Sequence, residues 1–253
     1  MILQRLATSI RKQDWFTVAI ETLIVVLGVF LGIQLGNWNA ARHARDTEQN
    51  ALTLLLEEAE NNVSYSELTI YRASLLQQDR EAALAKLSGE TPVAGDPAQG
   101  MALMPVFRDM TPIHAAHDEL AASGDIRLIR SADVRAAMSL YEGVVLFHDR
   151  ARTEYMDRAQ DILTLASPYM TLRYDLAAPL GYTAEVDWAA AGEDAQLMNA
   201  INRVMGEQVI FNERRQIVLD HVRTLCEVLS QAAAKPCDPQ DWVDMEIRGV
   251  PIE

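Results

Sequence analysis

Two histidines of this 253-residue chain lie one helical turn apart and are followed directly by two acidic residues. His114 and His117 are three positions apart, and Asp118 and Glu119 come next. On a helix, both imidazoles would lie on one face and could bind a metal ion such as zinc. The pair supplies too few ligands, and no Glu-x-x-His pair on another predicted helix completes a di-metal site. A solvated or capping role is therefore favoured, and we expect neither a metal ion nor another cofactor.

A third histidine, His148, falls on the apolar stripe of a predicted helix. Such a residue is usually hydrogen-bonded in a core, and a pH switch is the alternative. No Gly-rich phosphate loop, G-x-S-x-G elbow or H-E-x-x-H motif occurs in the sequence. We therefore expect a protein that is not an enzyme. A metal-dependent enzyme that uses His114 and His117 remains an alternative.

The two cysteines, Cys226 and Cys237, are 11 positions apart on either side of a predicted helix end. They form no disulfide framework and lack the spacing of a zinc site. A local disulfide requires Cα atoms within about 7 Å, so we expect one only if the helix ends early, near Gln231. An oxidising compartment is also required. The sequence therefore leaves both alternatives, a Cys226–Cys237 disulfide and two free cysteines.

The charges are distributed unevenly along a chain of ordinary globular composition, with 49% apolar and 23% charged residues. Of 22 basic and 36 acidic residues, five basic and two acidic ones lie in the first 45 positions. That region therefore carries a net charge of +3, and the other 17 basic and 34 acidic residues give −17. A domain this acidic repels nucleic-acid phosphates and anionic lipid, so we expect no nucleic-acid partner.

Residues 15–41 form a long apolar run with the single charge Glu21, and they read WFTVAIETLIVVLGVFLGIQLGNWNAA. As a helix, the 23 steps from Trp15 to Trp38 span about 35 Å, which matches a bilayer core with a tryptophan at each interface. The run predicts a transmembrane anchor. A buried core helix and a cleaved signal peptide are the alternatives. The basic residues before the run favour a cytoplasmic N-terminus and a periplasmic domain.

Within this run, Gly28, Gly32 and Gly36 form two overlapping G-x-x-x-G units. At about 100° per residue the glycines lie on one helix face, which Glu21 shares. Glycines let two helix backbones approach closely, and a carboxylate in lipid normally turns toward protein. We therefore expect a helix–helix contact through these four residues. Ordinary membrane composition, with Glu21 reaching toward the interface, is the alternative.

Two stretches, residues 21–39 and 118–142, carry recurring motifs. The first has an acidic entry and a G-x-x-x-x-x-Q-x-x-N-W-N exit, at Glu21, Gly28, Gln34, Asn37, Trp38 and Asn39. The second fits E-L-x-x-S-G-x-L-x-L-I, with isoleucine for the first leucine after the glycine, at Glu119, Leu120, Ser123, Gly124, Ile126, Leu128 and Ile129. Together they resemble a widespread bacterial family of single-pass membrane proteins whose domain has no assigned function. The resemblance implies an anchor and a helical domain, and no enzyme activity.

The remaining pattern predicts an all-α fold in which the transmembrane helix is followed by a bundle of about four helices. The anchor can run on as one long helix, because no Gly or Pro occurs between Asn37 and Ser88. The predicted helices cover about residues 47–87, 112–122, 131–166 and 193–234. The predicted organisation is a cytoplasmic N-terminus at 1–14, an anchor at 15–41, a helical soluble domain at 42–237 and an irregular tail at 238–253.

These patterns predict a helical interaction or scaffold protein of the bacterial inner membrane. The bilayer is its expected partner, together with a second copy or another membrane protein. A periplasmic ligand-sensing domain that signals through a partner is a second possibility, since only 14 residues precede Trp15 and cannot form an output domain.

Overall fold

The computed structural model describes residues 15–177 and 181–252, with side chains from residue 19 onward. The predicted N-terminal segment 1–14 lies outside the described residues. The chain is 75% helical, which confirms the predicted mostly helical fold. The chain divides into two compact units, Met1–Asn50 and Ala51–Glu253.

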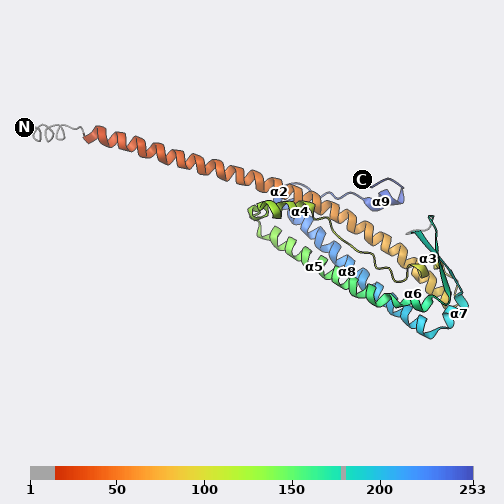
Figure 1. The fold of residues 1–253 in the computed structure, drawn as a ribbon. Coiled ribbons are helices and arrows are strands. Elements are labelled where there is room, and N and C mark those ends of the chain that lie inside the picture. Colours follow the sequence, from red (N-terminus) through yellow and green to blue (C-terminus); the bar gives the residue numbers. More distant parts are fainter. Residues whose placement is uncertain (1–14, 178–180, 253) are drawn as a thin grey trace, which may run out of the picture. The chain divides into compact units, whose positions relative to one another are not determined.

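Helix α2 (Trp15–Leu87) begins in the first unit and continues in the second (Figure 1). Its unbroken course confirms the continuity predicted from the lack of Gly and Pro after Asn37. In the first unit, the large apolar side chains from Ile20 to Leu35 are 40–64% exposed. This helix is long and apolar enough to cross a membrane, and no residue of its most apolar window is buried.

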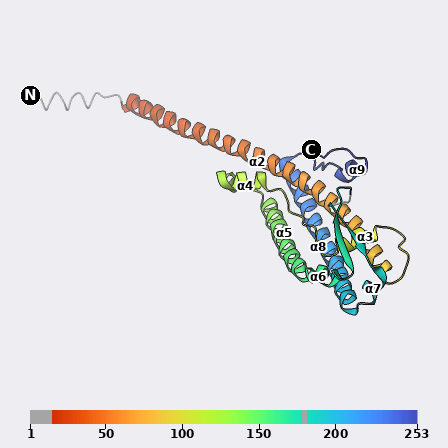
Figure 2. The same cartoon turned by 45° about the vertical axis from the view of Figure 1, so that its right-hand side comes forward.

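In the second unit, three long helices lie side by side: the remainder of α2, α5 (Ala132–Ala159) and α8 (Ala195–Ala233) (Figures 1 and 2). The short helices of the described chain complete this unit. They are α3 (Pro97–Ala102), α4 (Ala115–Ser123), the 3₁₀ helix η1 (Asp125–Leu128), α6 (Asp161–Ala166), α7 (Trp188–Glu193) and α9 (Trp242–Ile247).

Helix boundaries follow side-chain caps. The Ser131 hydroxyl accepts a hydrogen bond from Val134 N at 3.2 Å and so caps α5 at the predicted helix start, residue 131. The predicted helix 131–166 is divided, however, because α5 ends at Ala159 and α6 begins at Asp161. The predicted helix 193–234 is α8, whose first turn is capped by Asp194.

A two-stranded antiparallel hairpin, not predicted from the sequence, lies between α6 and α7. It pairs β1 (Met170–Tyr174) with β2 (Tyr182–Val186), from Met170 opposite Val186 to Tyr174 opposite Tyr182. The side chains of Met170 and Ala184 are buried in the core, and this packing stabilises a hairpin too short to be stable alone.

The core of the second unit consists of two clusters along the bundle. One surrounds Phe107 and Phe211 near α3 and the hairpin, and the other surrounds Val134 and Val222 near α4. The methionine-rich segment after α3 closes the core, since Met101, Met104 and Met110 are at most 3% exposed. Gly100 allows α3 to lie against α2, because a Cβ there would come within 1.9 Å of Asp79 O.

The tail after α8, expected to be irregular, contains α9. The tail is held along α2 by two contacts: the backbone Asp238 N donates to Glu60 Oε1 at 2.9 Å, and the side chain of Glu246 forms an ion pair with Arg72 at 2.8 Å. These partners lie more than 170 positions apart in sequence, so local patterns could not reveal them.

Candidate functional site

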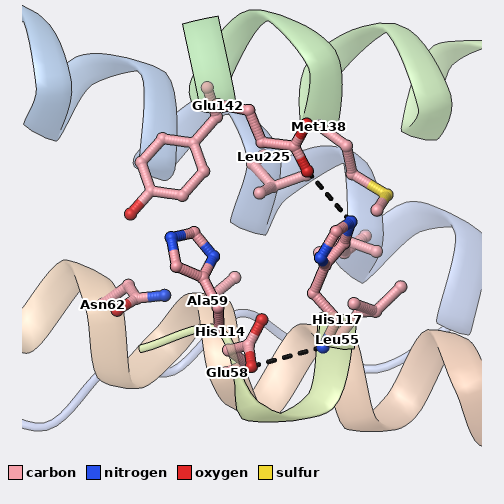
Figure 3. Close-up of a pocket in the computed structure, with 11 residues that line it drawn as sticks. Leu55, Glu58, Ala59, Asn62, His114, His117, Met138, Glu142 and Leu225 are labelled. Atoms are coloured by element: carbon pink, nitrogen blue, oxygen red, sulfur yellow. Dashed lines mark hydrogen bonds and ion pairs between the residues drawn. The ribbon is translucent and has the colours of Figure 1, made fainter. Parts of the chain in front are cut away.

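The histidines singled out by the sequence line a small pocket of the second unit, between α2, α4 and α5 (Figure 3). Its cavity measures about 20 Å³, which accommodates roughly one water molecule. The lining residues are Leu55, Glu58, Ala59, Asn62, His114, His117, Met138, Tyr141, Glu142, Leu225 and Leu229. By volume this pocket alone does not hold an organic ligand.

Two polar side chains of α2 position the histidine segment. The Asn62 side chain donates to Ile113 O at 2.9 Å and accepts from Ile113 N at 2.7 Å. Glu58 Oε2 accepts from Ala116 N at 2.6 Å and thereby caps α4 in place of a local residue. Helix α4 consequently begins at Ala115, and the predicted helix start at about residue 112 is wrong. Burial raises the pKa of Glu58, although its backbone hydrogen bonds oppose this shift.

The two histidines have different surroundings. His117 Nε2 lies 2.9 Å from Glu142 Oε1 of α5, and Figure 3 shows this contact as a dashed line. The ring centroids of His114 and His117 are 6.3 Å apart. Among the described residues, no group of three or more His, Cys, Asp or Glu side chains could hold a metal ion. This arrangement suits a hydrogen-bonded link between α4 and α5.

A larger cavity of about 340 Å³ adjoins this pocket and shares His114 and Glu142 with it. The volume is at the lower end of the range for small-molecule sites. Its remaining lining residues are Met110, Thr111, Pro112, Val145, Leu146, His148 and Asp149. An apolar wall and a few polar groups thus meet in one place. Sequence periodicity placed His148 in the core but gave no signal for a cavity beside it.

His148 is only 3% exposed, and its Nε2 has no hydrogen-bond partner among the described residues. Its ring stacks on Phe211 with a centroid distance of 4.5 Å. Burial, then the positive charges of Arg215, Arg152 and Arg214, lower the pKa of His148 to about 4. The imidazole is therefore neutral at pH 7, and its buried Nε2 is left without a hydrogen-bond partner among the described residues.

This pKa gives the fold a pH dependence. Protonation is less favourable in the folded chain than in the unfolded one, where the pKa is 6.5. The stabilising contribution is therefore complete above pH 6.5 and is lost as the pH falls toward 4, by about 3 kcal/mol. The change His148→Gln should flatten this part of the curve of unfolding free energy against pH. Parallel curves for the two proteins would contradict the buried, neutral histidine.

In the first unit, α2 brings the four predicted contact residues onto one face. A Cβ added at Gly28, Gly32 or Gly36 would meet no atom within 4 Å, so this face is open in the described chain. Glu21 is also exposed. The ring of Trp38 is 61% exposed, whereas the side chain of Trp15, the other predicted interfacial anchor, lies outside the described residues.

Cys226 and Cys237 form a disulfide, with Cα atoms 5.7 Å apart. The early helix end near Gln231 that the sequence indicates as the condition for this bond is not needed, since α8 continues to Ala233, close to its predicted end at about residue 234. The chain instead reverses at Ala234, whose left-handed backbone has φ 53°. Disulfides are typical of oxidising compartments, so this bond suggests an extracytoplasmic domain. The apolar start of α2 could accordingly be a membrane span or a signal sequence.

Comparison of the chain with protein-family models, curated proteins and solved structures gives no match in any of the three.

Proposed function

We propose that this chain is a helical interaction protein anchored in the bacterial inner membrane by the first part of α2. The observation that carries the proposal is the exposure of a whole apolar stretch from Ile20 to Leu35 in the described first unit. Exposing so many large apolar side chains to water is unfavourable, and a bilayer removes that cost. The motif resemblance to single-pass membrane proteins points the same way, and membership of that family is part of the proposal.

The charge distribution and the disulfide support the proposed orientation. The basic residues before the span favour a cytoplasmic N-terminus. The Cys226–Cys237 bond is stable in an oxidising compartment, which for a bacterial inner-membrane protein is the periplasm. Both arguments support a periplasmic location of the second unit.

Association through the anchor is the proposed molecular activity, with a second copy of the chain as the first partner. The open face of Gly28, Gly32 and Gly36 permits close backbone contact, for which van der Waals packing supplies the energy. Glu21 lies on this face, and a protonated carboxyl could donate a hydrogen bond to the partner helix. Each such bond contributes about 0.6–2 kcal/mol, so glycine packing should matter at least as much.

The change Gly32→Leu should weaken association in the membrane, because the leucine side chain separates the backbones. Val26→Leu is the matched control, since position 26 points about 120° away from the middle of the glycine face. Glu21→Gln should have a mild effect and Glu21→Leu a larger one, because the amide still forms hydrogen bonds. Cross-linking of the full chain in membranes measures all four variants.

Equal cross-linking of the four variants would contradict association through this face. A cross-linked product that contains a different protein, and no pair of identical chains, would replace the second copy by another membrane protein as the partner. Co-purification from solubilised membranes, with mass identification of the chains, distinguishes these two results.

A ligand-sensing domain is the second candidate, and the cavity beside His148 favours it. A mostly apolar wall that includes the neutral imidazole of His148 is suited to a small, largely apolar molecule. Imidazole-sized heterocycles are suitable probes. If the candidate is right, they should raise the thermal midpoint of the wild-type chain and leave that of His148→Phe unchanged.

A further inference from the structure

A third cavity, of about 270 Å³, lies farther along α2 than the histidine pocket and is bordered by the C-terminal tail. Its walls come from α2, from α3 with the segment that follows it, and from α9. The lining residues are Arg72, Leu75, Leu76, Asp79, Gln99, Leu103, Arg108 and Glu246. Two arginines in one cavity are notable in a chain with a net charge of −14.

Arg108 is the unusual member of this lining. Its Nε is buried and has no hydrogen-bond partner among the described residues. Burial, then the positive charge of Arg72, lower the pKa of Arg108. A guanidinium group with a buried, unused N–H is costly unless an acceptor binds it, and the planar fork of donors fits a carboxylate best.

Arg72 already holds a carboxylate in this cavity. Its Nε and Nη2 donate to the two oxygens of Glu246 at 2.9 and 2.8 Å. The side chains of this pair are 39% and 35% exposed, and exposed ion pairs contribute little to stability. Glu246 can therefore leave Arg72 at low cost when another carboxylate competes for it.

We propose that this cavity binds a small monocarboxylate with an apolar body, whose carboxylate pairs with Arg108 and Arg72 in place of Glu246. Without Glu246, the charged lining consists of Arg72, Arg108 and Asp79, which leaves one net positive charge for one negative ligand. Asp79 is engaged elsewhere, because it accepts from Asp96 N at 2.8 Å.

The leucines of the lining are the proposed contacts for the apolar body of the ligand. Leu75 and Leu76 belong to α2, and Leu103 follows α3. Burying a short hydrocarbon chain against them is favourable, whereas inorganic phosphate would gain nothing from these contacts. The site thus distinguishes an alkyl carboxylate from a free phosphate ion.

Calorimetric titration of the detergent-solubilised full chain with hexanoate tests the proposal. The wild type should bind saturably, and Arg108→Gln should bind about tenfold more weakly because one charged hydrogen-bonding partner is lost. Glu246→Gln should bind more tightly, since the internal competitor is gone. Arg223→Gln, which removes a surface ion pair with Glu67, is the matched control and should bind like the wild type.

Hexanoate that enters detergent does so equally in every variant, so only the differences between variants report on the site. Circular dichroism of Arg108→Gln checks that the helices are retained, and Arg108→Lys, which keeps the charge, should recover part of the affinity. Equal binding by wild type and Arg108→Gln, or no saturable binding of hexanoate, would overturn the proposal. Binding of phosphate without hexanoate would overturn it as well.

Discussion

Phe211→Ala should lower the free energy of unfolding by about 3–5 kcal/mol. The Phe211 side chain is fully buried. Its ring contacts Phe107 and Tyr155 edge to face, with centroids 5.4 and 5.8 Å away, and stacks with His148. Removing the ring leaves a cavity that this part of the bundle cannot fill, and the aromatic contacts are lost as well.

Denaturant unfolding of the full chain measures this effect, with Phe147→Ala as the control. Phe147 is 59% exposed, and the guanidinium of Arg214 lies 4.6 Å from its ring centroid. Its replacement should cost less than about 1 kcal/mol. A similar loss of stability in the two variants would contradict the claim that the aromatic contacts of Phe211 contribute strongly to the stability of the core.

Removing the disulfide should lower the free energy of unfolding by about 2–4 kcal/mol. The bond joins positions 11 apart in sequence and links the end of α8 to the tail carrying α9. Alanine suits the fully buried Cys226, and serine suits the partly exposed Cys237, so that no buried hydroxyl is introduced.

The loss of the disulfide can be separated from the loss of the side chains by reducing the wild type. Reduced wild type and the double variant should unfold at the same denaturant concentration, below that of the oxidised wild type. Hydrogen exchange should show faster exchange in α9, because the bond no longer holds the tail near α8. Unchanged stability in both cases would mean that the bond does not restrain the unfolded chain.

The elements that depend on neighbouring residues were predictable from the sequence. The continuity of α2 follows from the lack of Gly and Pro after Asn37, and the start of α5 follows from the Ser131 cap. By contrast, α4 begins at Ala115 because Asn62 of another helix binds Ile113 just before it and Glu58 of that helix binds Ala116 in its first turn. Those bonds connect residues more than 50 positions apart, which periodicity does not reveal.

The candidate sites likewise include one that local sequence spacing defines and others that only tertiary packing creates. The glycine face of α2 depends only on helical spacing, so the sequence suffices to define it. The surroundings of His148 and Arg108 arise from tertiary packing that gathers arginines around them, and no spacing rule indicates their cavities. The relation of His117 to Glu142 likewise becomes visible only when α4 meets α5.

The central claim is that an uncleaved α2 anchors the chain in the membrane while its disulfide-bonded unit lies outside the cytoplasm. Intact-mass measurement of the chain from washed membranes, with free thiols blocked at lysis, tests it most directly. We predict a full-length chain with no blocked cysteine and a mass lower by the two hydrogens of the Cys226–Cys237 bond. A chain shortened at its N-terminus would identify a signal sequence, and two blocked cysteines would place the domain in a reducing compartment; either result would contradict the claim.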